Sequence, residues 1–451
     1  MSDIIAAIAT GRAPCAIGIL RLSGPGCAAL TGRVFTPKQP FADAPDRRLV
    51  LGLLHDRQGR VIDECLGVVC RAPHSYTGEE TVELQCHGSP AMLAAGLEAL
   101  LAAGARQAGP GEFTRRAFLN GKLDLTQAEA VVDLIDAETA DAAANAAGQL
   151  GGALKRAIGP VYDGLTDLCS HFHAVLDYPD EDIEDFGAAE LSGALDRAGA
   201  ALQELLATYE KGRHLRQGVR AVLLGKPNAG KSSLLNRLAG YDRVIVTDIA
   251  GTTRDTVEEP VRVGRVLLRL TDTAGIREAG DAIEALGVAR SEQAAREAEL
   301  ALFVCDASQL LTDEDRRAIE AAKCAPRSLA LCNKSDLPAA VSPDELPFDT
   351  VLTVSARTGA GLDALPALLE GWFLGENACD GSLLTNPRQF GALDRASRAI
   401  ERAKTGLSLG VTPDAVLTDV EEAMAALGEV TGRTVREDIT NRIFERFCVG
   451  K

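Results

Sequence analysis

Short apolar runs separated by glycine and proline characterise the first part of the chain. Runs rich in β-forming residues predict strands at 16–22, 65–70 and 81–86. The alanine- and leucine-rich stretch 89–103 predicts one helix. These elements indicate a small α+β domain at residues 1–120.

A helical pattern follows this domain. Apolar side chains recur at helical spacing, as at Leu125, Ala128 and Val132, within long alanine-rich stretches. The same pattern returns in the C-terminal part of the chain. We therefore expect one discontinuous helical domain, at 121–214 and 378–451.

Between the two helical segments, apolar β-type runs alternate with helical stretches. This is the pattern of a parallel sheet with crossover helices. Because the two ends of a domain tend to lie close together, a domain is readily inserted into another one. We expect an inserted α/β domain at 215–377, and the whole chain is predicted to be a multidomain α+β protein.

A phosphate-binding motif stands near the start of the inserted domain. Residues 225–232 (GKPNAGKS) fit G-x4-G-K-[ST], after a strand-like run at 219–224 and before a helical pattern. The glycines let backbone N–H groups face phosphates at the start of the helix. Lys231 reaches the outer phosphates, and the hydroxyls of Ser232 and Thr253 are the expected Mg²⁺ ligands.

Three further motifs follow, each at the end of a strand-like run: 272–275 (DTAG), 333–336 (NKSD) and 355–356 (SA). The carboxylate of Asp336 can accept both N–H donors of guanine, whereas adenine would leave it unpaired at a cost of about 1–3 kcal/mol. The nucleotide is therefore GTP, and the inserted domain is expected to be a Ras-like P-loop G domain. The expected GTP-binding residues are Asn228, Ala229, Gly230, Lys231, Ser232, Ser233, Thr247, Thr253, Asp272, Thr273, Ala274, Gly275, Asn333, Lys334, Asp336, Ser355, Ala356 and Arg357.

The residue that positions the attacking water is harder to identify from the sequence. Ras-like enzymes use a glutamine beside the glycine of the DxxG motif, but Ile276 stands there in this chain. Three acidic residues follow, Glu278, Asp281 and Glu284. Spacing alone does not choose among them.

Short motifs outside the G domain extend from one end of the chain to the other. They stand at 4–10 (IIAAIAT), 17–24 (IGILRLSG), 76–80 (YTGEE), 82–84 (VEL), 87–88 (HG), 109–114 (GPGEFT), 117–125 (AFLNGKLDL) and 448–451 (CVGK). With the GTP motifs, they make the whole chain resemble the MnmE family of tRNA-modification GTPases, also called TrmE. The resemblance implies an N-terminal folate-binding and dimerising domain, a discontinuous helical domain and an inserted G domain.

The resemblance also assigns residues in the G domain. A K⁺ ion beside the β- and γ-phosphates would offset transition-state charge, and the G domains of two protomers would pair across it. The implied K⁺ ligands are Asn228, Thr247, Ile249 and Thr252. Glu284 matches the family's water-orienting glutamate and would act with Lys231 in catalysis.

A second site is implied in the N-terminal domain. The family's folate-binding positions correspond to Arg21, Glu83, Lys122 and Lys451. Cations suit an anionic tail, and a carboxylate can accept two donors from a pterin ring. A capping box of Thr434 and Glu437 predicts a helix that would carry Cys448 and Lys451 to one place. Cys448 is a further candidate catalytic residue, with an inert thiol as the alternative.

The reaction implied by the resemblance is the installation of an aminomethyl or carboxymethylaminomethyl group at C5 of the wobble uridine of certain tRNAs. The carbon would come from 5,10-methylenetetrahydrofolate, or a 5-formyl form. The protein would act as a homodimer, in a heterotetramer or larger assembly with MnmG, a flavoprotein that uses NADH. Because this chain has no convincing G-x-G-x-x-G motif, FAD is expected on the partner only.

Composition restricts how the chain can contact RNA. It has 47 Lys and Arg against 64 Asp and Glu, a net charge of −17, so bulk charge cannot hold nucleic acid. The partner should therefore supply much of the tRNA contact, with Arg115, Arg116 and 211–220 as local candidates here.

The remaining composition points to a cytoplasmic protein without a membrane span. No apolar run reaches the ~18 residues of a transmembrane helix, and the sequence shows no recognisable targeting signal. The 11 cysteines include no C-x-x-C pair, so most are expected to be buried thiols.

Two other functions remain open. The G domain alone would fit an Era-like ribosome-assembly GTPase, although no basic KH-like G-x-x-G segment follows it. The chain could also be a folate enzyme that a GTPase regulates, which would turn over without tRNA.

Overall fold

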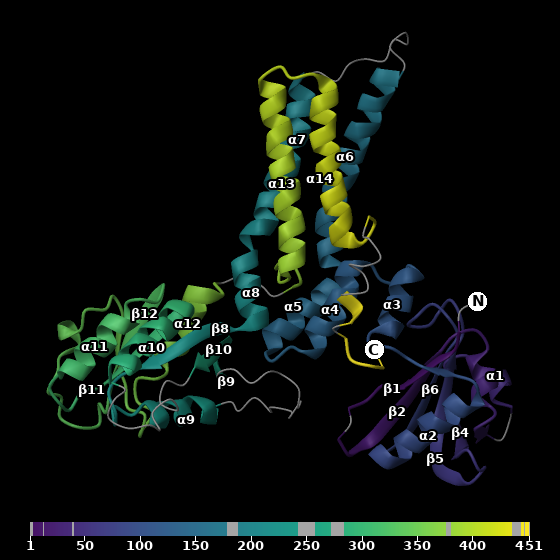
Figure 1. The fold of residues 1–451 in the computed structure, drawn as a ribbon, viewed down its shortest axis with the longest axis horizontal. Coiled ribbons are helices and arrows are strands. Elements are labelled where there is room, and N and C mark those ends of the chain that lie inside the picture. The colour runs from purple at the N-terminus through teal and green to yellow at the C-terminus, as the bar shows by residue number, and fades with distance from the viewer. Residues whose placement is uncertain are drawn as a thin grey trace. The chain divides into compact units, whose positions relative to one another are not determined.

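The computed structural model describes residues 3–11, 13–37, 40–177, 188–241, 258–271, 284–375, 380–434, 443–445 and 447–450. The chain divides into two compact units (Figure 1). Unit 1 comprises Met1–Val132, Leu150–Leu195 and Arg398–Lys451. Unit 2 comprises Asp133–Gln149 and Asp196–Ser397.

Unit 1 contains a seven-stranded sheet in the order β3-β4-β5-β6-β2-β1-β7. All neighbouring strands are antiparallel except β1 and β7, which are parallel. The strands predicted at 16–22, 65–70 and 81–86 are confirmed. The seven strands are β1 (Ile5–Ile8), β2 (Cys15–Ser23), β3 (Phe35–Pro37), β4 (Val50–His55), β5 (Val61–Cys70), β6 (Thr81–Gly88) and β7 (Arg106–Gln107).

One helix of unit 1, α2 (Pro90–Ala103), packs on this sheet and confirms the helix predicted at 89–103. Its side chains Leu93 and Leu100 join Leu20 of β2 and Leu84 of β6 in one buried core. Side chains alternate between the two faces of a strand, so every second residue of β2 and β6 reaches this core.

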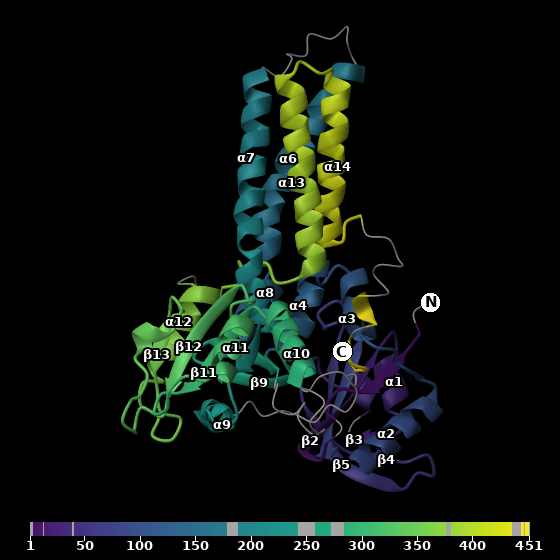
Figure 2. The ribbon, with the colours of Figure 1, turned by 60° about the vertical axis from the view of Figure 1, so that its left-hand side comes forward.

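The helical pattern predicted after the first domain is also confirmed. The helices α6 (Ala153–Asp177) and α14 (Pro413–Thr431) lie side by side (Figure 2). Cys169 Sγ is 3.4 Å from Met424 Sδ, and His173 Nε2 is 3.1 Å from Glu421 Oε1. Of the other helices that begin in unit 1, α4 and α7 end at residues assigned to unit 2, and the remaining ones have eight residues or fewer. The set is α1 (Cys27–Thr31), η1 (Phe41–Asp43), α3 (Glu112–Leu119), α4 (Leu125–Ile135), α6 (Ala153–Asp177), α7 (Ala188–Ala207) and α14 (Pro413–Thr431).

Unit 2 contains a six-stranded sheet in the order β13-β12-β11-β8-β10-β9. Five of its strands are parallel, as predicted, but β9 is antiparallel to β10. The difference arises because only Gly264 and Arg265 separate β9 from β10, and a connection this short can form only a hairpin. The strands are β8 (Val219–Leu224), β9 (Glu258–Val263), β10 (Val266–Thr271), β11 (Leu300–Asp306), β12 (Arg327–Asn333) and β13 (Val351–Thr353).

Both faces of this sheet are covered. Alternate residues of β11 enter two different cores: Leu302 joins the core that contains Leu234 of α9 and Leu365 of α12, whereas Phe303 joins the core that contains Ile319 of α11. Burial on both faces explains why β11 is a continuous apolar run. The helices assigned in this part of the chain are α5 (Ala140–Leu150), α8 (Tyr209–Gln217), α9 (Lys231–Tyr241), α10 (Glu284–Glu297), α11 (Asp313–Ala322), η3 (Pro343–Glu345), α12 (Ala364–Phe373) and α13 (Pro387–Ser408).

Among the described helices, none combines the length and the apolar composition that crossing a membrane requires.

Candidate functional site

The predicted phosphate-binding loop connects the end of β8 to the start of α9 in unit 2. Two of its glycines are required by close packing. A Cβ at Gly225, where φ is +143°, would lie 2.1 Å from the carbonyl oxygen of Val304, and one at Gly230 would lie 2.1 Å from Asn333 Nδ2. Asn228 also adopts a left-handed backbone, with φ +62°, which asparagine tolerates better than most residues. The loop therefore has the tight conformation that its sequence predicts.

Asn333 connects this loop to two other predicted motifs. Its Nδ2 donates to the carbonyl oxygen of Ala229 at 2.9 Å, and its Oδ1 accepts from the backbone N–H of Ala356 at 2.9 Å. The residue is only 2% exposed. One buried amide thus holds the P-loop, the NKSD motif and the SA motif in fixed positions, because each of its bonds would be costly to break.

The carboxylate of Asp336 is held for hydrogen bonding. Ser355 Oγ donates to Oδ1 at 2.6 Å, and the Arg357 guanidinium lies 2.9 Å from Oδ2. The hydrogen bond from Ser355 and the positive charge of Arg357 lower the pKa of Asp336 below its ordinary value. Asp336 is therefore ionised at neutral pH, the state that accepts two N–H donors.

The NKSD lysine has a different partner. Lys334 adopts a left-handed backbone, with φ +65°, and its Nζ lies 2.6 Å from Oδ2 of Asp306. Burial raises the pKa of Asp306, but hydrogen bonds from Lys334 and Ser308 outweigh burial and lower it overall. Asp306 ends β11, so the pair attaches the NKSD loop to the neighbouring strand.

A further ion pair holds the P-loop in place. Lys226, the second residue of the loop, lies 2.9 Å from the fully buried carboxylate of Asp315. That carboxylate also accepts from the N–H and Oγ1 of Thr312 at the start of α11. No sequence pattern predicts this pair. The T-x-x-D pattern of Thr312 and Asp315 could have predicted the start of α11, but it contains no information about Lys226.

Lys231 and Ser232 lie where the motif predicts, at the start of α9. Lys231 Nζ donates to the carbonyl oxygens of Gly225 at 2.6 Å and Lys226 at 2.8 Å, and Ser232 is exposed. Glu284 begins α10, but its side chain is outside the described part of the molecule. Also outside it are the predicted residues Thr247, Ile249, Thr252, Thr253, Asp272, Thr273, Ala274 and Gly275.

In unit 1, the predicted folate residues Arg21 and Glu83 face each other on paired strands. They are opposite in the β2–β6 register, and Arg21 Nε lies 2.8 Å from Glu83 Oε1. The guanidinium carbon of Arg21 is 5.8 Å from the ring centroids of both Tyr76 and Phe113. Arg21 also donates to the carbonyl oxygen of Gly450 at 3.3 Å. Strand, aromatic and C-terminal residues thus meet around one guanidinium.

Two other predicted residues of unit 1 lie at its surface. Lys122 is exposed, and its Nζ donates to the carbonyl oxygen of Pro73 at 3.2 Å, a few residues before Tyr76. Cys448 is also exposed, and its carbonyl accepts from the N–H of Gly111 at 3.3 Å. Lys451 and Glu437 fall in the parts of the chain that are not described, so the roles predicted for them stay predictions.

Comparison with known proteins matches almost the entire chain. A model of the "GTP-binding protein TrmE N-terminus" matches residues 4–122, and a model of the "MnmE helical domain" matches residues 125–448. The tRNA modification GTPase MnmE of Roseiflexus sp. (strain RS-1) is 45% identical over 465 residues, covering 100% of this chain and 99% of that protein. The proteins of the same name from Symbiobacterium thermophilum and Aquifex aeolicus are 44% and 41% identical, each over 100% of this chain.

Proposed function

Since this chain belongs to the MnmE family of tRNA-modification GTPases, we propose that it modifies C5 of the wobble uridine of certain tRNAs. It is a GTP hydrolase whose reaction is coupled to tRNA modification. The modification is an aminomethyl or carboxymethylaminomethyl group, its carbon comes from a tetrahydrofolate one-carbon unit, and a flavoprotein partner carries the FAD.

The observation that supports this proposal best is the guanine-binding geometry around Asn333 and Asp336. Asn333 fixes the loop that receives the base relative to the loop that receives the phosphates. Asp336 presents an ionised carboxylate to the two N–H donors of guanine. Because adenine carries no such pair of donors, this site selects GTP over ATP.

Two cations complete the hydrolytic site in the proposal. Ser232, at the N-terminus of α9, would hold Mg²⁺, and the exposed amide of Asn228 would contribute to K⁺ binding. Hydroxyl and amide oxygens are the ligands that such hard cations prefer. Both cations supply positive charge beside the phosphates. Lys231 would bind the outer phosphates, and Glu284 would orient the attacking water.

The folate site in the proposal is built around Arg21 and Glu83. The Glu83 carboxylate can accept from the donors of a pterin ring, while Arg21, Lys122 and Lys451 supply positive charge for the anionic tail. The exposed aromatic ring of Tyr76, which lies next to Arg21, can stack on a planar ring, whereas Phe113 is fully buried and supports Arg21 from the core. The backbone carbonyl of Cys448 accepts from the N–H of Gly111, two residues before Phe113. The exposed thiol of Cys448 is a candidate for the chemistry.

The proposed assembly is a homodimer bound to the flavoprotein partner in a heterotetramer or larger complex in the cytoplasm. The net charge of −17 supports the proposal that the partner supplies much of the tRNA contact, because an acidic protein attracts tRNA weakly. The isolated protein should therefore bind tRNA poorly at physiological salt. Tight binding that resists salt would contradict this part of the proposal.

The decisive experiment compares tRNA nucleosides from cells with and without the gene by mass spectrometry. Loss of the C5-modified wobble uridine, restored by the intact gene, would support the proposal. An unchanged nucleoside profile together with accumulated ribosome precursors would instead support an Era-like assembly GTPase.

A further inference from the structure

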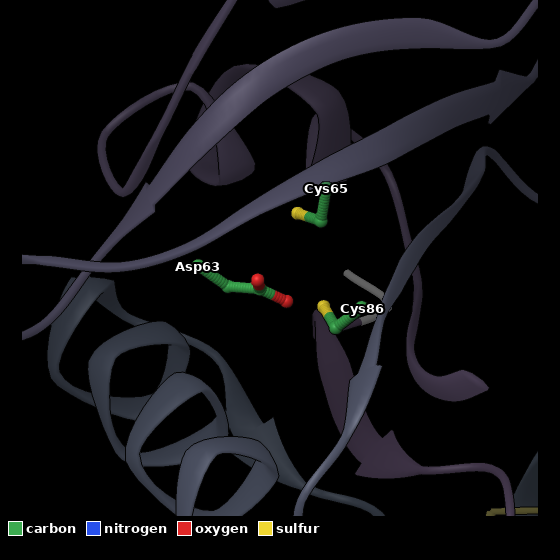
Figure 3. A group of neighbouring side chains, drawn as sticks. All are labelled: Asp63, Cys65 and Cys86. Carbon is green, nitrogen blue, oxygen red and sulfur yellow. The ribbon is translucent and has the colours of Figure 1, made fainter. Parts of the chain in front are cut away.

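Two thiols and a carboxylate face one another in the sheet of unit 1. Asp63 and Cys65 are two residues apart on β5, so their side chains project from the same face of that strand. Cys86 lies on β6, the antiparallel neighbour of β5, beside the registered pair Leu66 and Gln85. One ligand atom of each of these three side chains lies within 4.8 Å of the other two. Figure 3 shows the three side chains pointing toward one another.

All three groups are shielded from solvent. Cys65 and Cys86 are each 3% exposed, and the side chain of Asp63 is 8% exposed. Both cysteines belong to the apolar core that contains Leu54 and Leu84. A carboxylate at the border of such a core is costly to keep charged unless it has partners.

Asp63 is oriented by His87, the residue that follows Cys86. The backbone N–H of His87 donates to Asp63 Oδ2 at 2.8 Å, and its Nδ1 lies 2.7 Å from Oδ1. Each oxygen of a carboxylate has two lone pairs, so one hydrogen bond on each leaves capacity for a further ligand. Outer contacts of this kind are what hold the ligands of metal sites in position.

We propose that Asp63, Cys65 and Cys86 form a binding site for a thiophilic divalent cation, and that this cation is Zn²⁺. Two thiolates and one carboxylate oxygen are ligands that Zn²⁺ binds, and they provide three corners of a tetrahedron, with a water molecule carried in by the cation as the fourth ligand. Cys65 and Cys86 give up their thiol protons to water when the cation binds, and no atom changes its oxidation state. The cation joins β5 to β6, and it stabilises the folded domain because the unfolded chain lacks the assembled site.

This proposal does not depend on the proposed function. Among the described residues, these three are the one group of at least three His, Cys, Asp or Glu side chains with ligand atoms this close. The site could not be predicted from sequence because D-x-C followed by a distant Cys is not a recognisable motif. Strand pairing brings the third ligand to the other two.

The test uses the full-length protein, reduced and stripped of metal by a chelator, and titrated with Co²⁺ alone as a spectroscopic probe. We expect one equivalent to bind with sulfur-to-cobalt charge-transfer absorption in the near ultraviolet. The band should disappear in C65S and in C86S and should persist in C70S, since Cys70 lies on the same strand but on its opposite face. No thiolate band in the wild type, or an equal band in C65S, would overturn the proposal.

A second measurement needs no variant and therefore cannot fail through misfolding. The wild-type protein is treated with N-ethylmaleimide in mild urea, with and without Zn²⁺, and the labelled cysteines are mapped by mass spectrometry. Zn²⁺ should protect Cys65 and Cys86, while the half-buried Cys324 of unit 2 reacts equally in both samples. Equal labelling of Cys65 and Cys86 with and without Zn²⁺ would refute the site, as would a disulfide between them in freshly purified protein.

Discussion

The ammonium group of Lys226 lies 2.9 Å from the carboxylate of Asp315, which is fully buried. The pair joins the phosphate-binding loop to the first turn of α11. It explains how a loop that must remain open to a ligand can still be held in one conformation.

Replacing Lys226 by Met should destabilise unit 2 by about 3 kcal/mol, because Asp315 would become a buried charge without its cation. Urea unfolding can be followed by the fluorescence of Trp372, the single tryptophan of the chain, which packs against the core of unit 2. The control is Lys323→Met, since Lys323 forms a surface pair with Glu320 and should change stability by less than about 1 kcal/mol. Equal midpoints for the Lys226 variant and the wild type would show that the pair is not stabilising.

Asp336→Asn should exchange guanine recognition for xanthine recognition. Xanthine has a carbonyl where guanine has its exocyclic amine, so an amide side chain can donate to it while accepting from the ring N–H. We expect GTP affinity to fall by about 10-fold to 100-fold and XTP affinity to rise. Competition against a fluorescent guanine nucleotide measures both, with the exposed Asp344→Asn as control. Undiminished GTP affinity in the Asp336 variant would remove this residue from the base site.

GTP hydrolysis should slow steeply when K⁺ is replaced by Na⁺, because a site that fits K⁺ holds the smaller Na⁺ poorly. Asn228→Ala should remove most of the difference between the two salts, with some loss of GTP affinity in both, because Asn228 belongs to the phosphate-binding loop and its left-handed backbone strains alanine. Asn236→Ala, at an exposed position of α9, is the matched control. Phosphate release measured at constant ionic strength tests this, and equal wild-type rates in both salts would exclude a K⁺ role for Asn228.

Glu83→Gln should weaken binding of 5-formyltetrahydrofolate by about 10-fold or more, since a neutral amide is a weaker acceptor than a carboxylate. The substitution keeps the shape of the side chain but removes its charge pair with Arg21. Calorimetric titration of the purified protein provides the affinity. Glu64→Gln, at an exposed position on β5, should bind as the wild type does, and a similar loss in both variants would argue against a specific site.

Acid should destabilise unit 2 partly through Glu299. Burial raises the pKa of this carboxyl, but hydrogen bonds from His214 and Arg213 outweigh burial and lower the pKa from the ordinary 4.5 to about 2. Because the folded state holds the lower pKa, the carboxylate stabilises the fold above pH 4.5, and this stabilisation is lost as the pH falls toward 2.

Glu299→Gln should therefore be less stable than the wild type at pH 7, and the difference should shrink at about pH 3. Urea midpoints from Trp372 fluorescence at both pH values test the prediction. The exposed Glu297→Gln serves as control. A difference that stays constant between the two pH values would mean that Glu299 acts through packing and not through its charge.

Much of unit 2 could be predicted from sequence because its signals are local. The predicted strand at 219–224 coincides with β8, and the strand-like run expected directly before the DTAG motif is β10. The P-loop lies between a strand and a helix, as the motif requires. In each case neighbouring residues in the chain determine the conformation, through apolar periodicity or through glycines that alone fit the backbone.

The sequence by itself determined that this protein binds GTP, since P-loop, DxxG, NKSD and SA motifs each encode their chemistry within a few residues. Only the tertiary structure decided what supports those motifs, namely the amide of Asn333 between two loops and the ion pair of Lys226 with Asp315. It alone also brought Cys86 next to Asp63 and Cys65. These contacts join residues far apart in the chain, and a side chain's distant neighbours depend on which strands pair and in which register. Local sequence does not contain that information, because it is the packing of the whole chain that selects the pairing.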